Sequence, residues 1–213
     1  MGAGIFYYKA LVEAHLALGL SPRLLMVHAD VRRVMNHAAA READQLAQYL
    51  AGLLRQLAVG GAEIATIPAF SPQVCATELA ALTPIPLVSL LDAIVAEVKQ
   101  RRLRRVLLFG ARVTMETQMF GTLHDVEVVA ARPEEVDRIA AIYVRVVEQA
   151  RASDEDYNAL HSLAHTLIER EKLDAIIFAG TDLAFVFNPK NTDFPYVDGA
   201  RVHLKAIMSE LLR

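Results

Sequence analysis

Acid–base chemistry is available in the closing segment of the chain. Asp198 stands five residues before His203, and an amphipathic helical pattern runs from Asp198 to about Leu212. A carboxylate and an imidazole beside one cleft can move a proton to and from a ligand, because histidine changes charge near neutral pH. A structural role is also open to both residues, with the aspartate capping the helix and the histidine packed within it.

Other histidines stand where a ligand or a metal ion could bind. His28 ends the apolar run Leu24–His28, and ligands of α/β sheets bind at the ends of strands. His161 and His165 share one face of a helical pattern, as a pair of metal ligands would. The residues between them lack the glutamate of a zinc-protease helix and no third ligand is evident, so the sequence predicts no metal site.

The chain contains one cysteine, Cys75, so no disulfide can form within it. This usage favours a reducing, cytoplasmic location. The thiol is either a small buried apolar group or a reactive site, and the sequence leaves both roles open.

The composition is typical of a globular protein with a sizeable core. Of the 213 residues, 54% are hydrophobic and 22% are charged. The net charge is −3, and the one basic cluster, Arg101–Arg105, is typical of a solvated helix end, so no nucleic-acid partner is predicted. No apolar run approaches the ~18 residues of a membrane span, and the start lacks a signal-peptide pattern, so we expect no membrane partner.

Strand-like and helix-like segments alternate along the chain. The expected strands are short apolar runs at Leu24–His28, Glu63–Ile67, Val106–Phe109, Val126–Val129 and Ala175–Phe178. The longer helical patterns cover Ile5–Leu18, Arg41–Val59, Ser89–Arg101, Pro133–Ala150, Asp154–Lys172 and Asp198–Leu212. Ser71 and Pro72 are expected to open a further helix, with Ser71 as its cap. Because parallel strands need crossover helices, the alternation predicts an α/β fold with mostly parallel sheets flanked by helices.

Two turns, Pro68–Ser71 and Ala179–Leu183, each follow a buried apolar run in a different half of the chain. Such strand ends carry the chemistry of α/β sheets, so we expect two similar lobes with an active-site cleft between them. The Thr83–Pro86 segment breaks the pattern and is expected to cross between the lobes. One lobe would hold residues 1–84 with 194–213, and the other residues 85–193. A lobe of this kind normally opens with a strand, whereas this chain opens with a helix, so we expect either a shortened start or further residues upstream.

Five stretches of the sequence together resemble one known family. They are Ala3–Tyr8, Ala62–Ser71, Val106–Met115, Asp174–Leu183 and Val197–His203. In order and spacing they are similar to five segments of the aspartate/glutamate racemases. These segments are the first helix, the two that each carry a cysteine, the Gly-Thr-x-x-Thr-Met turn and the closing Asp-x-(Ala/Thr)-x-x-His stretch. The likeness is greatest to the aspartate racemase branch.

The resemblance implies a cofactor-independent enzyme with two cysteines on opposite sides of the substrate's α-carbon. In this chain the matching positions are Ala69 and Gly180. Neither residue can remove or return a proton, so the alignment excludes racemisation by two thiols. The resemblance also implies a small carboxylate as the ligand and a homodimer as the assembly.

The same resemblance suggests which residues line the site. Positions that contact substrate in the family are matched by Ser71, Thr114 and Thr181. Asp182 replaces a glutamate and would act as a base or orient a neighbour, and Phe70 replaces an asparagine and makes the pocket more apolar. We therefore expect Asp182, His203 and Asp198 as catalytic groups. The expected binding set is Ala69, Phe70, Ser71, Thr114, Gly180, Thr181 and His28.

Three functional hypotheses are compatible with these residues. The first is a racemase-fold enzyme of amino-acid or secondary metabolism that performs isomerase, lyase or cyclase chemistry on a small carboxylate- or carbonyl-containing metabolite. The second is a non-catalytic metabolite-binding or regulatory relative. The third is a truncated or engineered version of an ordinary racemase. The first two differ in one observable, because only an enzyme exchanges substrate protons with solvent.

Overall fold

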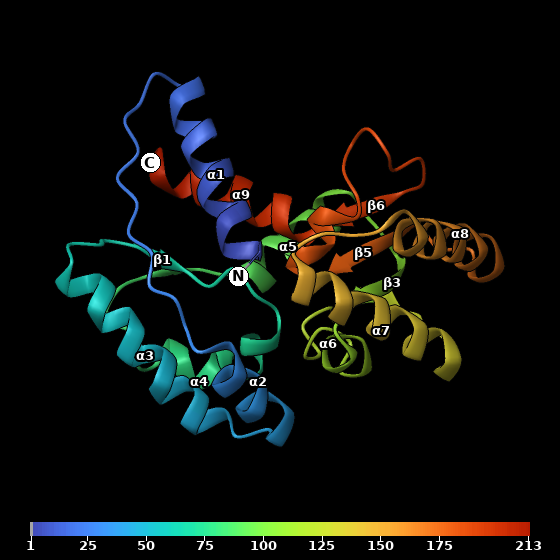
Figure 1. Cartoon of the computed structure of the whole chain (residues 1–213), viewed down its shortest axis with the longest axis horizontal. Coiled ribbons are helices and arrows are strands. Elements are labelled where there is room, and N and C mark those ends of the chain that lie inside the picture. Colours follow the sequence, from blue (N-terminus) through green and yellow to red (C-terminus); the bar gives the residue numbers. More distant parts are fainter. Residues whose placement is uncertain (1) are drawn as a thin grey trace.

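Two parallel β-sheets organise the computed structural model, which describes residues 2–213 (Figure 1). The larger sheet has the strand order β4-β3-β5-β6, and the smaller sheet pairs β1 with β2. The strands are β1 (Ala65–Thr66), β2 (Leu87–Val88), β3 (Arg105–Gly110), β4 (Glu127–Val128), β5 (Ala175–Ala179) and β6 (Tyr196–Asp198). Helices flank both sheets, which confirms the predicted α/β class with two lobes.

Helices occupy most of the remaining chain. They are α1 (Gly2–Ala17), α2 (Val31–Ala40), α3 (Ala43–Val59), α4 (Ala76–Ala80), α5 (Leu90–Gln100), α6 (Arg112–Glu116), α7 (Pro133–Gln149), α8 (Asp154–Glu171) and α9 (Gly199–Leu211). Two short 3₁₀ helices, η1 (Ser71–Cys75) and η2 (Thr181–Phe185), follow β1 and β5. Among residues 2–213, no helix combines the length and the apolarity that crossing a membrane requires.

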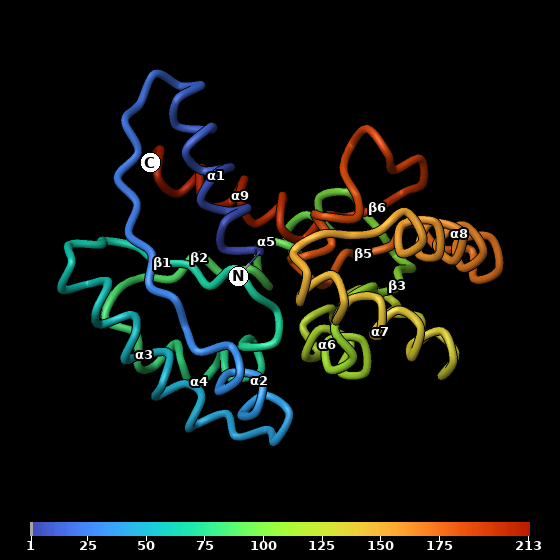
Figure 2. Tube along the Cα trace, viewed as in Figure 1, coloured from blue at the N-terminus to red at the C-terminus, as the bar shows by residue number. Residues whose placement is uncertain are grey.

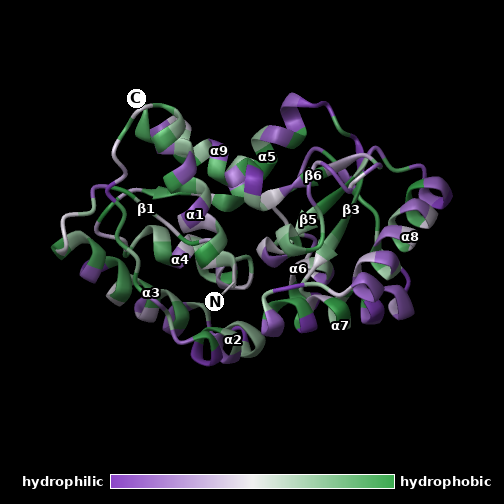
Figure 3. Cartoon of the chain, turned by 45° about the horizontal axis from the view of Figure 1, so that its top comes forward, coloured by the Kyte–Doolittle hydropathy of each residue, from purple (hydrophilic) through white to green (hydrophobic). Residues whose placement is uncertain are grey.

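The two central strands of the larger sheet are buried on both faces. Leu107 and Phe109 of β3 pack into a core with α7 and α8, whereas Val106 and Leu108 pack into a second core with α5. Side chains alternate between the faces of a strand, so an unbroken apolar run is what a doubly covered strand requires. Figure 3 shows these strands as hydrophobic and the outer surface of α8 as largely hydrophilic.

The smaller sheet is covered by helices of the first half of the chain. Leu46, Leu50 and Leu54 line one face of α3 and form a core with Ala65 and Cys75. Burying side chains of this size contributes about 1.5–3 kcal/mol each. Helix α1 packs instead on α9, so the first and last helices of the chain lie side by side (Figure 2).

The predicted strand Leu24–His28 is wrong. The segment has no strand or helix assignment, Leu25 and Met26 are 54% and 60% exposed, and His28 is exposed. Figure 2 shows the chain passing β1 here on its way from α1 to α2. An apolar run becomes a strand only when a neighbouring strand takes its hydrogen bonds, and the strand of this lobe, β1, pairs with β2 instead.

Two helix starts also differ from prediction. Gly2–Gly4 form the first turn of α1, so this helix begins three residues before the predicted start at Ile5. The 3₁₀ helix η1 begins at Ser71 itself, so Phe70 occupies the cap position and no side chain caps the helix. The N-cap is the residue that precedes the first turn of a helix, and Ser71 lies within that turn. The predicted cap role of Ser71 is therefore wrong.

The boundary between the lobes stays a prediction. The predicted lobes divide the chain after residue 84 and after residue 193. Residues 87–88 pair with β1 and residues 196–198 pair with β5, so each division lies within a few residues of a strand. Helix α9, which follows β6 directly, packs on both α5 and α1.

Candidate functional site

The two strand-end turns meet in the structure. The chain leaves β1 through Pro68 and Ala69 and leaves β5 through Gly180 and Thr181. The Thr181 hydroxyl donates a hydrogen bond of 3.1 Å to the carbonyl oxygen of Pro68, across 113 residues of sequence. Thr181 is almost fully buried, so this bond joins the two lobes away from solvent.

Tyr143 of α7 fills the space beside Gly180. A Cβ atom added to Gly180 would lie 2.7 Å from Cζ of Tyr143 and 3.0 Å from its hydroxyl oxygen. The ring therefore occupies the volume that any side chain at position 180 would enter. Burial raises the pKa of the Tyr143 phenol, and the nearby Asp182 raises it further, so the phenol stays protonated. No sequence pattern marks Tyr143 as a site residue, because a tyrosine on the inner face of a helix is usually a core residue.

Asp182 lies next to Thr181 and is 7% exposed. Its Oδ1 atom accepts a hydrogen bond of 3.1 Å from the backbone N–H of Ala3, in the first turn of α1. Burial raises the pKa of the Asp182 carboxyl, and the bond from Ala3 opposes that rise. A carboxylate with a raised pKa is a stronger base than a solvated one, so this group has the character of a general base.

His203 is fully buried, and both of its ring nitrogens have partners. Nε2 lies 3.0 Å from the carbonyl oxygen of Val88 and 2.8 Å from Oγ1 of Thr66. A carbonyl only accepts, so Nε2 carries the proton, and Nδ1 accepts from the Tyr7 hydroxyl at 3.1 Å. Burial lowers the pKa of His203 to about 4, so the ring is neutral at pH 7. These contacts tie α9 to β1, β2 and α1.

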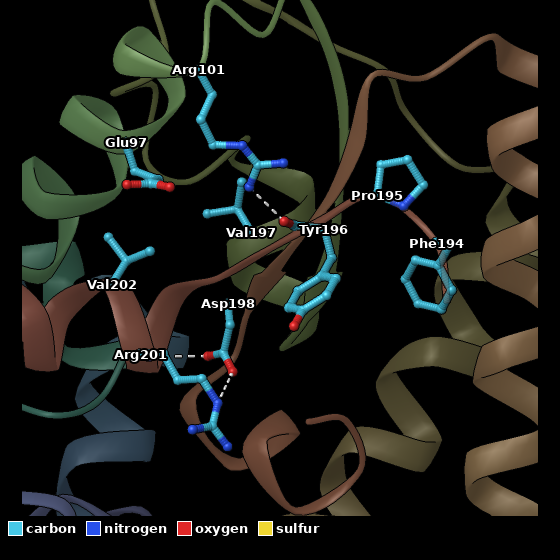
Figure 4. A pocket seen from close by; sticks show the side chains of 9 residues that line it. All are labelled: Glu97, Arg101, Phe194, Pro195, Tyr196, Val197, Asp198, Arg201 and Val202. Carbon is cyan, nitrogen blue, oxygen red and sulfur yellow. Dashed lines mark hydrogen bonds and ion pairs between the residues drawn. The ribbon is translucent and has the colours of Figure 1, made fainter. Parts of the chain in front are cut away.

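Asp198 caps α9 and lines a groove that none of the residues of the two turns lines. Its Oδ1 accepts from the backbone N–H of Arg201 at 3.1 Å, and its Oδ2 lies 3.0 Å from Nε of the same residue. Burial raises the pKa of Asp198, and Arg201 opposes the rise. Figure 4 shows this groove of about 460 Å³ along β6, where Arg101 donates to the Tyr196 carbonyl at 2.7 Å. Asp198 and His203 therefore have separate surroundings despite their spacing in sequence.

Phe70 belongs to the core. It is 2% exposed, packs with Leu90 and Ile94 of α5, and its ring lies 2.9 Å from where a Cβ on Gly199 would stand. The neighbouring Ala69 is partly buried, and its carbonyl accepts from the Gln73 side chain at 2.9 Å. Of the residues expected at the first turn, Ala69 and Ser71 are thus the two that retain some exposure.

Thr114 and Cys75 are both completely buried. Thr114 lies on α6, directly after β3, and its hydroxyl has no hydrogen-bond partner among residues 2–213. The Cys75 thiol contacts the Pro72 carbonyl at 3.2 Å, and burial raises its pKa to about 11. A thiolate is the reactive form of cysteine, so Cys75 is unreactive near neutral pH.

Comparison with known proteins assigns the fold to a family. The sequence profile described as Asp/Glu/Hydantoin racemase matches residues 2–207. The chain belongs to the Asp/Glu/hydantoin racemase family. No curated protein matches the sequence.

Several solved structures share the fold. A candidate Asp/Glu racemase from Yersinia pestis superposes with a TM-score of 0.83 at 21% identity, covering 99% of this chain and 94% of that one. An aspartate racemase homologue from Pyrococcus horikoshii gives a TM-score of 0.82 at 21% identity with the same coverage of 99% and 94%. The aspartate racemase of Picrophilus torridus gives 0.70 at 14% identity, covering 98% of this chain and 89% of that one.

Proposed function

We propose that this racemase-family chain is an enzyme that acts on a small carboxylate- or carbonyl-containing metabolite by acid–base chemistry, without two catalytic thiols. The observation that carries the proposal is that two buried titratable groups, the Asp182 carboxyl and the Tyr143 phenol, lie near Gly180, the position that the sequence resemblance aligns with the second cysteine of the family. At the position aligned with the first cysteine, Ala69 offers no titratable group. Isomerase, lyase and cyclase reactions that start by removing a proton beside a carboxylate or carbonyl group would share the proton transfer that this pair would perform.

Asp182 and Tyr143 would have complementary roles in that transfer. Removing a proton beside a carboxylate or carbonyl leaves negative charge on the substrate oxygen. The raised pKa of Asp182 suits it to accept the proton, while the protonated phenol of Tyr143 would donate a hydrogen bond to the developing charge. General acid–base catalysis of this kind contributes about 10²–10⁴-fold in rate.

The remaining predicted residues would act around this pair. Thr181 and Ser71 lie on the two facing turns, so we assign them to binding an anionic group. The contacts of Asp198 and His203 favour a positioning role, in which they fix the start and the second turn of α9. The roles of Thr114 and His28, the homodimer, the absence of a cofactor and the cytoplasmic location stay predictions.

A second function is favoured by the contacts that close the junction. Oδ1 of Asp182 is already bonded to Ala3, and the Thr181–Pro68 bond holds the turns together. A relative that binds a metabolite without turnover would retain such contacts, because it needs no free base. This non-catalytic function is the alternative to the enzyme.

Proton exchange into D₂O separates the two functions. The wild-type chain would be incubated with small amino acids, dicarboxylic acids and 2-oxo acids. Loss of the signal from protons on the carbon next to the carboxylate or carbonyl group would be followed by ¹H NMR. For the enzyme we expect exchange with at least one compound, a loss of about 10²–10⁴-fold in Asp182→Asn, and full activity in Cys75→Ser. Saturable binding with no exchange would support the alternative, and neither binding nor exchange would reject both.

A further inference from the structure

Two histidines and an aspartate converge on the outer side of α8, away from the two turns. His161 and His165 are spaced i,i+4 on the helix, and Asp193 lies on the segment between η2 and β6. Oδ1 of Asp193 lies 2.7 Å from Nε2 of His161 and 2.9 Å from Nε2 of His165. All three ligand atoms lie within 4.8 Å of one another.

Neighbouring aromatic rings fix the orientation of both imidazoles. The ring of Tyr157 lies 5.3 Å from that of His161. Phe194 packs edge-on against His165 at 5.5 Å and also contacts His161 at 5.8 Å. A histidine whose ring is held by packing loses little freedom when it binds a metal, so the pair is preorganised.

We propose that His161, His165 and Asp193 form a binding site for a divalent transition-metal cation, of which Zn²⁺ is the best match. Two neutral imidazoles and one carboxylate are a ligand set that this ion accepts, with water in the fourth position. The site is built from two elements, so a bound cation would fasten the segment that carries Asp193 to α8.

The distances suit this ion after a small movement. Ligand atoms about 2.0 Å from a tetrahedral Zn²⁺ stand about 3.3 Å apart, so Asp193 would shift outward by about half an ångström. Its side chain is 68% exposed on a loop, which allows such a shift. The side chains of His161 and His165 are 25% and 48% exposed, so a cation can reach them from solvent.

Without a cation, the same three side chains form an ordinary hydrogen-bonded cluster. The metal site and the hydrogen-bonded cluster differ in how many of the three side chains they need. In a hydrogen-bonded cluster each histidine needs only a carboxylate partner, as His37 has in Glu42 at 2.7 Å. A metal site requires both histidines and the carboxylate together.

The test is Co²⁺ and Zn²⁺ binding to the untagged full chain. Co²⁺ in a four-coordinate site absorbs visible light far more intensely than hexaaqua Co²⁺ does, and one equivalent of Zn²⁺ should displace it. Removing an outer-shell partner of a metal ligand costs about 10–100-fold in affinity, so His161→Ala, His165→Ala and Asp193→Ala should each cost more than tenfold. His37→Ala is the matched control, because it removes a histidine from a carboxylate pair that lacks a second imidazole.

Hydrogen exchange gives an independent readout in the same samples. Zn²⁺ should slow amide exchange in the segment around Asp193 in wild type and in His37→Ala, and should leave it unchanged in His165→Ala. The proposal is overturned if wild type shows no Co²⁺ absorption, or if the three ligand variants bind as tightly as wild type. Retained folding of each variant is checked by its circular dichroism spectrum.

Discussion

Filling the space at Gly180 tests whether the ring of Tyr143 occupies the volume that a side chain at this position would enter. In Gly180→Ala the new methyl group would lie 2.7 Å from Cζ of Tyr143, closer than a carbon contact allows. The ring is packed among Ile139, Ile142 and Leu183 and cannot move freely. Overpacking of this kind costs about 1–3 kcal/mol. Gly180 has φ −155°, which alanine also adopts, so the substitution itself recovers about 0.4–1 kcal/mol.

The expected net result is a loss of about 1–2 kcal/mol in the free energy of unfolding, measured by urea denaturation. Gly52→Ala is the matched control: Gly52 lies within α3, and a Cβ there would meet only the Arg55 side chain at 3.8 Å. Alanine in that helix should stabilise the chain by up to about 1 kcal/mol. If Gly180→Ala stabilised the chain as Gly52→Ala does, the space beside Gly180 would be open and the role given to Tyr143 would be wrong.

Three further predictions concern single contacts. Burial lowers the pKa of His203 from 6.5 to about 4, so on acidification the unfolded chain binds a proton before the folded chain does. The free energy of unfolding should therefore fall by about 3 kcal/mol as the pH drops from 6.5 to 4. The variant His203→Gln should flatten that part of a pH–stability curve. Thr181→Val removes the bond to Pro68 and should cost about 0.5–1.5 kcal/mol in urea denaturation, whereas no change would show that the bond is absent in solution. Cys75, buried with a pKa near 11, should react with a thiol reagent only on unfolding, and rapid labelling of the native chain would contradict that burial.

The strands whose bounds were predicted most closely are those that are covered on both faces, whereas Glu63–Ile67 and Val126–Val129 contain only the two-residue strands β1 and β4. Val106–Phe109 and Ala175–Phe178 are unbroken apolar runs, and both became central strands because helices cover each side of the sheet. The run Leu24–His28 has a similar composition but no paired neighbour, and pairing is a property of the whole fold. Composition alone therefore could not separate the two cases.

The candidate site was predictable only where its residues are adjacent in sequence to a strand end. Thr181 and Asp182 follow the end of β5, and they were predicted because this segment resembles the second cysteine segment of the racemases. Tyr143 lies on a helix and meets Gly180 only through packing, so no local pattern marks it. Asp193 is 28 residues from His165, and its convergence with the two histidines depends on where the chain passes before β6.

A mechanism that uses the Cys75 thiol and the mechanism proposed here make opposite predictions about one rate ratio. The measurement is α-proton exchange into D₂O by Asp182→Asn, relative to Cys75→Ser, with a compound that the wild-type chain exchanges. We predict a ratio below about 10⁻², because Asp182 carries the proton transfer and Cys75 takes no part. Exchange that survives in Asp182→Asn and disappears in Cys75→Ser would contradict the account.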